Sequence, residues 1–512
     1  AGPPPPPADR LFAVNHDGSN ALTWGELGVK KNRIAHSLSK RVPHDVVAGA
    51  VYGKNSVEWL VCSQVCQALG LRFTPINWHL VADEIAYIVD DCDADVVFFG
   101  AEYAAQVQAM KPRTPKVKLW VCMDGNADSA VSLQTLLDEA PADAQLPAHN
   151  RVGGAVSYTG GTSGRPKGAV RTGGMAANPQ TMMAMLNEWG FMRMMPHVVQ
   201  LVAAPLYHAM PLAWYSIGMP LGGTFVLMPK FDAEQALAAI QRFKVNGFYM
   251  PPILLKRLLN APDAVKKKYD RTSIKTIMSG GAACPTSVKQ GINDLFGPVL
   301  YELYGASELG GVTIMDGETM LKKPLSCGKP ATGIEVILLD DQKNRVTEPM
   351  VPGEIFAKGM NIDRYHKLEA KTQEAKFGDF FSVGDVGYFD ADGYLYISDR
   401  KIDMVVSGGV NIYPAAVEEI LQAHPDIEDV AVFGVPDAEF GERVHAALKS
   451  FAGRKVTAED ILKFCEGKIG KFQLPKAKDI SFHSEDFPRS EAGKLRKKVL
   501  KAQIMGTPAS KL

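Results

Sequence analysis

Hydrophobic positions follow two different periodicities between residues 21 and 280. Residues 26–39 place apolar side chains at helical spacing, whereas residues 96–99 form a short apolar run that Gly100 closes. Most of the later runs are followed by a helix-like segment, and these runs cover residues 200–204, 224–228, 247–250 and 276–278. Strand-sized runs that alternate with helical segments predict an α/β fold with a largely parallel sheet.

The pattern changes after about residue 330. Residues 334–339, 353–358 and 394–398 have the composition of short strands joined by Gly or Asp turns, which is typical of an antiparallel sheet. From Met404 onward, helical segments (415–423 and 458–467) mix with strand segments (430–433 and 446–450). With a boundary between Asp399 and Met404, we predict a large N-terminal domain at 1–400, built of several subdomains with a β-rich part, and a small α+β domain at 401–512.

Length and charge limit the classes of function. A chain of 512 residues exceeds one ordinary core, which agrees with two or more domains. Its 46% hydrophobic and 22% charged residues are typical of a soluble globular protein, and no apolar run is long enough to predict a membrane span. Because 56 Lys and Arg balance 56 Asp and Glu, overall charge selects neither nucleic acid nor an anionic membrane as a partner.

The seven cysteines are scattered and include no Cys-x-x-Cys pair. This spacing argues against a disulfide framework or a zinc site and favours a reducing compartment. Cys62 and Cys66 stand at helical i,i+4 spacing in a mostly apolar stretch. We therefore predict two buried core thiols there.

Both ends of the sequence carry distinctive patterns. Five consecutive prolines, Pro3 to Pro7, predict a stiff, unpacked leader. The last three residues are Ser510, Lys511 and Leu512, which in a eukaryote are the peroxisomal address and in a bacterium carry no meaning. We expect a peroxisomal protein in the first case and a cytoplasmic one in the second.

The strongest local motif runs from Tyr158 to Gly168 and reads Tyr-Thr-Gly-Gly-Thr-Ser-Gly-Arg-Pro-Lys-Gly. Glycines free backbone N–H groups to surround an anion, hydroxyls donate to phosphate oxygens, and a lysine adds positive charge. The motif is not a Walker A loop, which requires Ser or Thr directly after Gly-Lys. A flexible surface turn is the alternative, but Pro166 and the clustered hydroxyl residues exceed what a linker needs.

This motif resembles the phosphate-binding loop of the adenylate-forming (ANL) superfamily, which includes acyl-CoA synthetases, peptide-synthetase adenylation domains and luciferases. Further stretches resemble the family in the same order, and they lie at residues 23–27, 75–80, 205–208, 304–308, 384–385, 399–400 and 488–494. The stretch at 75–80, Pro-Ile-Asn-Trp-His-Leu, is similar to a signature of fatty acyl-CoA ligases. The resemblance implies ATP-dependent activation of a carboxylic acid through an acyl-adenylate, then transfer to CoA with release of AMP and pyrophosphate.

The resemblance also implies a nucleotide site. The phosphates would be held by Thr159, Gly160, Gly161, Ser163, Gly164, Lys167 and Ser307. The adenine would lie against Gly280, Gly281, Ala282, Tyr304 and Gly305. The ribose would be held by Asp385 and by Arg400, which would also contact phosphate. Glu308 would hold Mg²⁺, for which one carboxylate is enough beside substrate phosphates. Gly280, Gly281 and Ala282 (the Gly280 segment) could instead form a simple turn, and so could Asp385. Glu308 could instead be a solvated loop carboxylate.

The catalytic candidates that the resemblance implies are Lys494, Thr162, Glu308 and His208. Attack of a carboxylate on the α-phosphate of ATP brings two anions together, and a cation such as Lys494 offsets that repulsion. The frame Pro-x-Ser-x-x-Gly-Lys singles out Lys494 from the basic residues that follow it. His208 would lie between the acyl and nucleotide sites, without acid–base work; a satisfied core histidine is the alternative.

In the family the small domain rotates after adenylation, so we expect residues 401–512 to be mobile. Gly408 and Gly409 would then line the passage for the pantetheine thiol of CoA. The hinge departs from the family, because Ile402 stands where Asp or Lys is usual, and Asp403 follows it. The departure leaves the hinge residue open.

Residues 181–221 are rich in methionine and also contain Trp189, Phe191 and Trp214. In the family this region helps to line the acyl site, and adaptable Met side chains suit an apolar ligand. Helix core packing is an equal alternative. Medium- or long-chain, branched and aryl acids all remain open, as does an amine or another acceptor in place of CoA, and the sequence does not indicate an oligomeric state.

Overall fold

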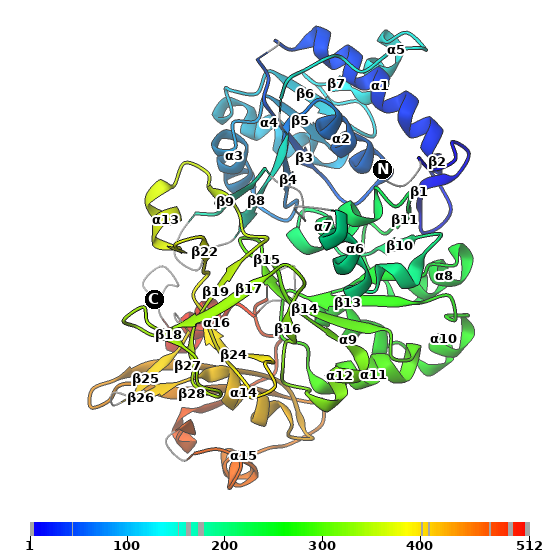
Figure 1. Cartoon of the computed structure of the whole chain (residues 1–512). Coiled ribbons are helices and arrows are strands. Elements are labelled where there is room, and N and C mark those ends of the chain that lie inside the picture. The colour runs from blue at the N-terminus through cyan, green and yellow to red at the C-terminus, as the bar shows by residue number, and fades with distance from the viewer. Residues whose placement is uncertain are drawn as a thin grey trace. The chain divides into compact units, whose positions relative to one another are not determined.

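The computed structural model describes residues 5–43, 45–151, 153–159, 165–172, 179–400, 403–407, 410–470, 473–489 and 495–506. The chain divides into two compact units, and Figure 1 labels the helices and strands of both. The first unit contains residues 1–325, 330–334 and 358–376, and the second contains residues 326–329, 335–357 and 377–512. The predicted boundary at residue 400 stays a prediction.

The first unit holds a mainly parallel sheet with the strand order β15-β14-β13-β12-β10-β11-β1-β2. Its parallel strands are β1 (Leu11–Asn15), β10 (Val199–Val202), β11 (Thr224–Leu227), β12 (Gly247–Tyr249), β13 (Thr276–Gly280) and β14 (Leu300–Ala306). The antiparallel strands β15 (Gly310–Asp316) and β2 (Leu22–Thr23) lie on either side of these parallel strands. The α/β prediction is confirmed, and the four apolar runs from residue 200 to 278 are strands.

A second sheet of the first unit has the order β20-β9-β8-β4-β3-β5-β6-β7. Its parallel part is β7 (Val131–Ser132), β6 (Leu119–Cys122), β5 (Val96–Phe99), β3 (Ala48–Tyr52), β4 (Arg72–Ile76) and β8 (Gly154–Thr159). The antiparallel strands β9 (Lys167–Arg171) and β20 (Arg364–Tyr365) extend it at one edge.

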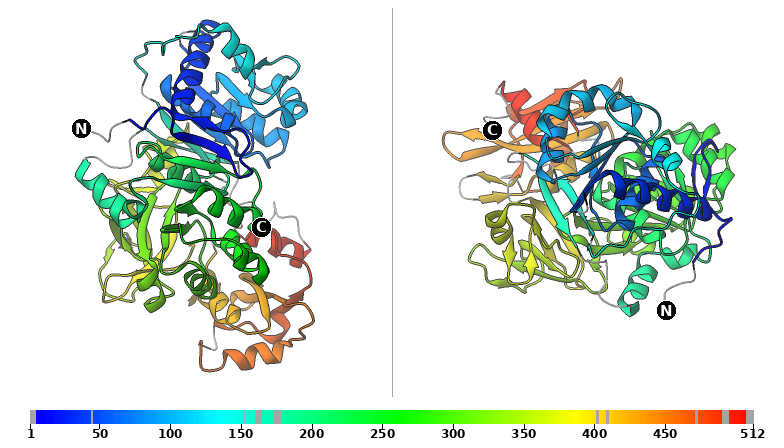
Figure 2. Two further views of the ribbon diagram at one scale, coloured as in Figure 1. Left: turned by 90° about the vertical axis from the view of Figure 1, so that its right-hand side faces the viewer. Right: turned by 90° about the horizontal axis from the view of Figure 1, so that it is seen from above.

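This second sheet carries helices on both faces, and the side chains of β5 pack against both sets of helices (Figures 1 and 2). Val96 and Phe98 pack with α1 (Trp24–Arg41) and α2 (Val57–Ala68), whereas Val97 and Phe99 pack with α3 (Ala82–Asp91) and α4 (Ala104–Met110). Successive side chains of a strand point to opposite faces, so an unbroken apolar run suits a strand that is buried on both sides.

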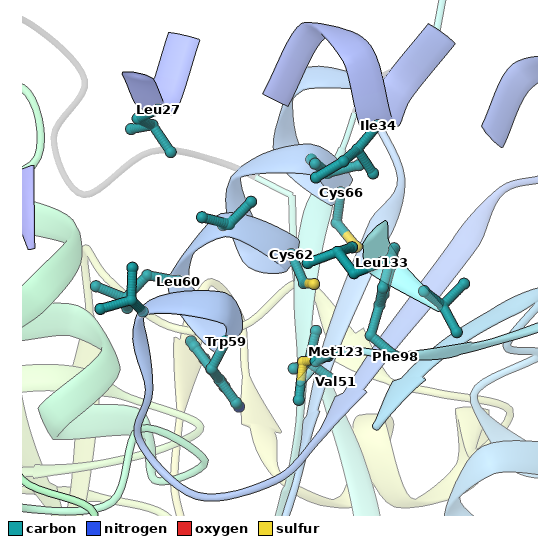
Figure 3. Close-up of a cluster of buried hydrophobic side chains, with 14 of the residues drawn as sticks. Leu27, Ile34, Val51, Trp59, Leu60, Cys62, Cys66, Phe98, Met123 and Leu133 are labelled. Atoms are coloured by element: carbon teal, nitrogen blue, oxygen red, sulfur yellow. The ribbon is translucent and has the colours of Figure 1, made fainter. Parts of the chain in front are cut away.

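The predicted core thiols lie on α2. Ser56 precedes this helix as its N-cap, and its hydroxyl accepts a hydrogen bond from the backbone N–H of Trp59. Cys62 and Cys66 are free and fully buried beside Ile34 and Leu133 (Figure 3). Burial raises the pKa of the Cys66 thiol to about 12, because a thiolate is poorly solvated there. The prediction of two buried core thiols is confirmed.

The second unit is richer in antiparallel strands. Its first sheet contains β17 (Glu335–Leu339), β19 (Gly353–Lys358), β22 (Phe380–Phe381), β23 (Asp385–Phe389) and β24 (Leu395–Arg400). Its second sheet contains β25 (Val405–Ser407), β26 (Val410–Ile412), β27 (Ile427–Asp437), β28 (Gly441–Ser450) and β29 (Ile480–His483). The three predicted strands before residue 400 are confirmed, each within one or two residues of its expected ends.

Helices α14 (Pro414–Gln422) and α15 (Ala458–Cys465) cover a separate apolar core in this unit, which includes Val417 and Ile461. Helix α16 (Lys497–Met505) follows near the end of the chain. Among the described helices, none combines the length and the apolar character that crossing a membrane requires. The terminal Ser510–Lys511–Leu512 lies outside the described residues, and the peroxisomal address stays a prediction.

Candidate active site

The glycine motif lies between two paired strands of the first unit. β8 ends at Thr159 and β9 begins at Lys167, and these two residues are partners in the antiparallel ladder. The two ends of the segment between them are thus held side by side. Gly160, Gly161, Thr162, Ser163 and Gly164 lie outside the described residues, and their roles stay predictions.

Glu308 receives two hydroxyl donors on one carboxylate oxygen. Thr159 Oγ1 and Tyr365 Oη each lie 3.2 Å from Glu308 Oε1. From the described residues, Oε2 receives no hydrogen bond. A carboxylate with one oxygen oriented and the other open fits a Mg²⁺ ion, which takes one or two carboxylates together with phosphate oxygens.

No group of three or more His, Cys, Asp or Glu side chains that could hold a metal occurs among the described residues. Among these residues, a cation at Glu308 would therefore have one carboxylate ligand, which leaves positions for water and ATP phosphates. This donor set suits a Mg²⁺ ion that arrives with the nucleotide, and it does not resemble a closed structural metal site.

The Gly280 segment and the Tyr304 segment leave adjacent parallel strands at the same edge of the sheet. Gly280 ends β13 and is the ladder partner of Leu303 on β14, one residue before Tyr304. Ligands of open α/β sheets bind at the carboxyl ends of the strands. The structure thus brings together the two segments that were predicted to contact adenine.

Backbone crowding accounts for the glycines of these segments. A Cβ on Gly280 would collide with the Leu303 carbonyl oxygen, and one on Gly305 would collide with the Gly310 carbonyl oxygen. Gly281 has φ +83°, a conformation that favours glycine. The Tyr249 hydroxyl donates to the Gly280 carbonyl oxygen at 2.9 Å, which fixes the end of β13 from the side.

Two further residues contact this site and were not predicted. Tyr365 reaches Glu308 from β20, and the guanidinium of Arg171 donates to the carbonyl oxygens of Ser307, at 3.2 Å, and Met360. Burial lowers the pKa of Arg171, although the nearby carboxylates of Asp363 and Glu308 oppose that shift. In the sequence, Arg171 directly follows the apolar Gly-Ala-Val of β9, and this position was the feature from which it could have been predicted.

His208 lies at the N-terminus of α7 (Ala209–Gly218), with its ring centroid 4.3 Å from that of Tyr207. Its Nε2 atom is buried and has no hydrogen-bond partner among the described residues. Burial, and next the charge of His79, lower the pKa of His208 to about 4. The ring is therefore neutral at pH 7, and its place between the acyl and nucleotide sites stays a prediction.

In the second unit, Asp385 and Arg400 are ladder partners on β23 and β24. Asp385 is buried and follows Gly384, whose φ of +81° turns the chain into the strand. The backbones of the two residues that are predicted to hold the ribose are thus paired in one sheet. Lys494, Ile402, Gly408 and Gly409 lie outside the described residues, so their roles stay predictions.

The methionine-rich region forms α6 (Pro179–Glu188), η3 (Phe191–Met194), β10 and α7. Phe191 and Trp214 are buried, with ring centroids 4.1 Å apart. Met185 and Met194 are also buried, whereas Met183 is exposed. Core packing accounts for these buried side chains, so they give no independent evidence of an acyl site.

Comparison with known proteins adds two family matches. Residues 5–364 match the model described as AMP-binding enzyme, and residues 416–494 match the AMP-binding enzyme C-terminal domain. Indoleacetate–CoA ligase from Aromatoleum aromaticum is 30% identical over 485 residues, which cover 93% of this chain and 92% of that protein. A long-chain-fatty-acid–CoA ligase from Bacillus subtilis is 33% identical over 353 residues, 68% of this chain and 61% of that protein.

Solved structures match over the same extent. ATP-bound MatB from Rhodopseudomonas palustris superposes with a TM-score of 0.85 and 25% identity, covering 96% of this chain and 95% of that one. Amide bond synthetase McbA from Marinactinospora thermotolerans also gives a TM-score of 0.85, covering 96% and 97% of the two chains. At 22% identity, the second match shows the fold alone.

Proposed function

The chain belongs to the AMP-binding enzyme family of the adenylate-forming superfamily, and we propose that it is an ATP-dependent acyl-CoA ligase for an apolar carboxylic acid. The acid's carboxylate oxygen attacks the α-phosphorus of ATP, and the bond to pyrophosphate breaks to leave an acyl-adenylate. The CoA thiol, on losing its proton, then attacks the acyl carbon, and AMP leaves. The products are an acyl-CoA thioester, AMP and pyrophosphate.

The observation that carries this proposal is the similarity, over nearly the full length of both chains, to a CoA ligase named for an aryl acid. The match to a ligase named for long-chain fatty acids extends the candidate acids to aliphatic chains. The two named acids share a carboxylate attached to an apolar body. This shared chemistry supports an apolar acid, with medium- or long-chain, branched and aryl acids as the candidates.

The site residues take the following roles in the proposal. Lys167 and the glycine loop bind phosphates, and the open oxygen of Glu308 takes Mg²⁺, which would neutralise phosphate charge when bound. The adenine is flanked by Gly280, Gly281, Ala282, Tyr304 and Gly305. The ribose is held by Asp385 and Arg400, and Ser307 contacts phosphate. The passage for the CoA thiol is lined by Gly408 and Gly409. Lys494 and Thr162 stabilise the charge that develops at the α-phosphorus.

His208 contributes shape and low polarity in this scheme. Its neutral ring at pH 7 places no positive charge beside an apolar alkyl or aryl group. A neutral imidazole beside Tyr207 suits the border between a polar nucleotide site and an apolar acyl site.

Pyrophosphate release from ATP, measured across a panel of acids with and without CoA, tests the proposal. The panel should contain medium- and long-chain fatty acids, branched acids, and aryl acids such as indoleacetate, with a dicarboxylate as the polar control. We expect release that apolar acids elicit and that CoA enhances, together with AMP and a thioester. AMP formation that depends on an added amine and not on CoA would show that the acceptor is an amine. Absence of AMP with every acid would refute the proposal.

A further inference from the structure

Tyr365 contacts two oppositely charged residues of the site at once. Its hydroxyl lies 3.2 Å from Glu308 Oε1, and the ammonium of Lys167 lies over its ring, 5.4 Å from the centroid. The side chain is buried, with 6% of the residue exposed. One tyrosine thus meets the proposed phosphate-binding lysine with its face and the proposed Mg²⁺-binding glutamate with its edge.

Lys167 and Glu308, both within the described part of the chain, form no ion pair with each other. A direct ion pair would occupy the carboxylate and the ammonium before ATP and its metal arrive. A hydroxyl and an aromatic face hold the two groups by weaker contacts, which leave each charge available to a ligand.

A second tyrosine of the first unit shows the contrasting arrangement. Lys268 lies over the ring of Tyr269, 4.9 Å from the centroid, and the Tyr269 hydroxyl donates to Glu234 Oε1 at 2.9 Å. Here the lysine also pairs directly with the glutamate, with 2.8 Å between Lys268 Nζ and Glu234 Oε1. The same three side-chain types can therefore close into an ion pair, which the Tyr365 site does not do.

Backbone pairing fixes the position of Tyr365. Tyr365 is the ladder partner of Ala169 on β9, the strand that begins at Lys167. The next residue, His366, donates its N–H to the Gly168 carbonyl oxygen at 2.7 Å, and Lys367 Nζ lies 2.8 Å from Asp93 Oδ1. Because β9 carries both Lys167 and the partner of Tyr365, the distance between the two side chains is set by the sheet.

We propose that Tyr365 is a positioning residue that keeps Lys167 and Glu308 apart, so that Lys167 meets the phosphates of ATP and Glu308 Oε2 meets the Mg²⁺ ion. This inference rests on the proposed function for the identity of the ligand. It assigns the hydroxyl of Tyr365 to the metal side of the site and the ring to the phosphate side.

Two variants separate these contributions. Tyr365→Phe removes the hydroxyl and keeps the ring, so ATP binding without metal should stay unchanged while the gain in affinity from Mg²⁺ falls about 3- to 10-fold. Tyr365→Leu also removes the ring, so metal-free ATP binding should weaken by roughly a further 2- to 5-fold. Isothermal titration of the full chain with ATP, in excess Mg²⁺ and in EDTA, measures both quantities.

Tyr269→Phe is the matched control, because it removes a hydroxyl–glutamate contact under a lysine at a position outside the proposed site. It should leave both affinities within twofold of wild type. Thr159→Val removes the second donor to Glu308 Oε1, so it should also lower the gain in affinity from Mg²⁺, and its effect on that gain should be less than additive when it is combined with Tyr365→Phe.

The titration needs neither acid nor CoA, so an enzyme that uses another acceptor would still give a valid result. Thermal melts confirm that each variant is folded before it is titrated. A folded Tyr365→Phe protein with wild-type Mg²⁺ dependence would overturn the assignment, as would an equal loss of affinity in Mg²⁺ and in EDTA. Absence of Mg²⁺-dependent ATP binding in the wild type would overturn it together with the nucleotide site.

Discussion

Arg489 Nη2 lies 2.7 Å from both Oδ1 and Oδ2 of Asp429, which is part of β27. Arg489 is also bridged in antiparallel fashion to Leu495, and the Arg496 N–H donates to the Pro488 carbonyl oxygen at 2.8 Å. The two ends of segment 490–494 are therefore held together and tied to β27. This segment contains Lys494.

Substitution Arg489→Gln should slow formation of the acyl-adenylate about 10-fold and leave the second half-reaction within about twofold of wild type. The reason is that a lysine must be held accurately against the α-phosphate in the first step, and small errors of position are costly there. In the proposed mechanism the thiol step does not use Lys494. Pyrophosphate release reports the first step, and thioester formation from synthetic acyl-adenylate reports the second.

Arg443→Gln serves as the control, because Arg443 pairs with Asp479 at 2.8 Å in the same unit and its side chain is 32% exposed, against 33% for Arg489. It should change the two half-reactions in parallel. If Arg489→Gln also lowers both half-reactions equally, the Asp429 pair serves the fold of the second unit and not the placement of Lys494.

Lys494→Ala should reduce pyrophosphate release by roughly 100-fold or more, since loss of one preorganised charge contact in a transition state commonly has this size. The melting temperature should stay within a few degrees of wild type. Lys498→Ala removes an exposed lysine of α16 and should leave the rate unchanged. A Lys494→Ala enzyme with wild-type adenylation would remove Lys494 from the mechanism.

Local patterns in the sequence predict the long parallel strands well, and the short edge strands poorly. Residues 96–99 are apolar throughout because helices cover both faces of β5, so the local composition is enough to predict this buried strand. β20 has only two residues, Arg364 and Tyr365, and it joins the sheet by pairing with β9. Two residues carry no periodicity, so a pattern analysis cannot find such a strand.

The same limit applies to the candidate site. The family-like motifs located Thr159, Lys167, Tyr304 and Glu308, because each motif is contiguous in sequence. Tyr365 reaches Glu308 across 57 residues, and Arg171 reaches the Ser307 carbonyl oxygen across 136. These contacts arise from strand pairing in the folded unit, and nothing in the composition around either residue specifies the partner.

Lys289→Met should destabilise the first unit by about 3–5 kcal/mol, because it leaves the buried carboxylate of Glu302 without its cation. Lys289 Nζ lies 2.5 Å from Glu302 Oε2, and the two side chains are only 3% and 9% exposed. Burial already raises the pKa of Glu302, against the opposing effect of Lys289. Urea denaturation measures the free energy of unfolding.

The loss of free energy of unfolding that Lys289→Met causes should depend on pH in a defined direction. A carboxyl whose pKa is raised by folding favours the folded state when it is protonated, so its contribution is lost as pH rises. The penalty should therefore be larger at pH 8 than at pH 5.5, where the unpaired Glu302 more readily takes up a proton. Lys289→Met/Glu302→Gln should recover much of the stability at pH 8; a double variant as unstable as the single one would show that Lys289 acts through packing, or through its 2.7 Å hydrogen bond to the Pro324 carbonyl oxygen.

His208 should make the protein less stable in acid. Its pKa of about 4 in the folded chain lies below the ordinary value of 6.5, so protons bind more tightly to the unfolded state. The stabilising contribution of the neutral ring is complete above about pH 6.5 and is lost as pH falls toward 4. Between pH 7 and 5, wild type should lose about 1–2 kcal/mol more stability than His208→Gln, which cannot titrate.

Urea denaturation at both pH values gives the comparison, and the pyrophosphate-release profile from pH 6 to 8 should have the same shape for both proteins. Equal acid sensitivity would show that the ring is solvated in the folded protein, and a profile altered near pH 6.5 would assign His208 to proton transfer.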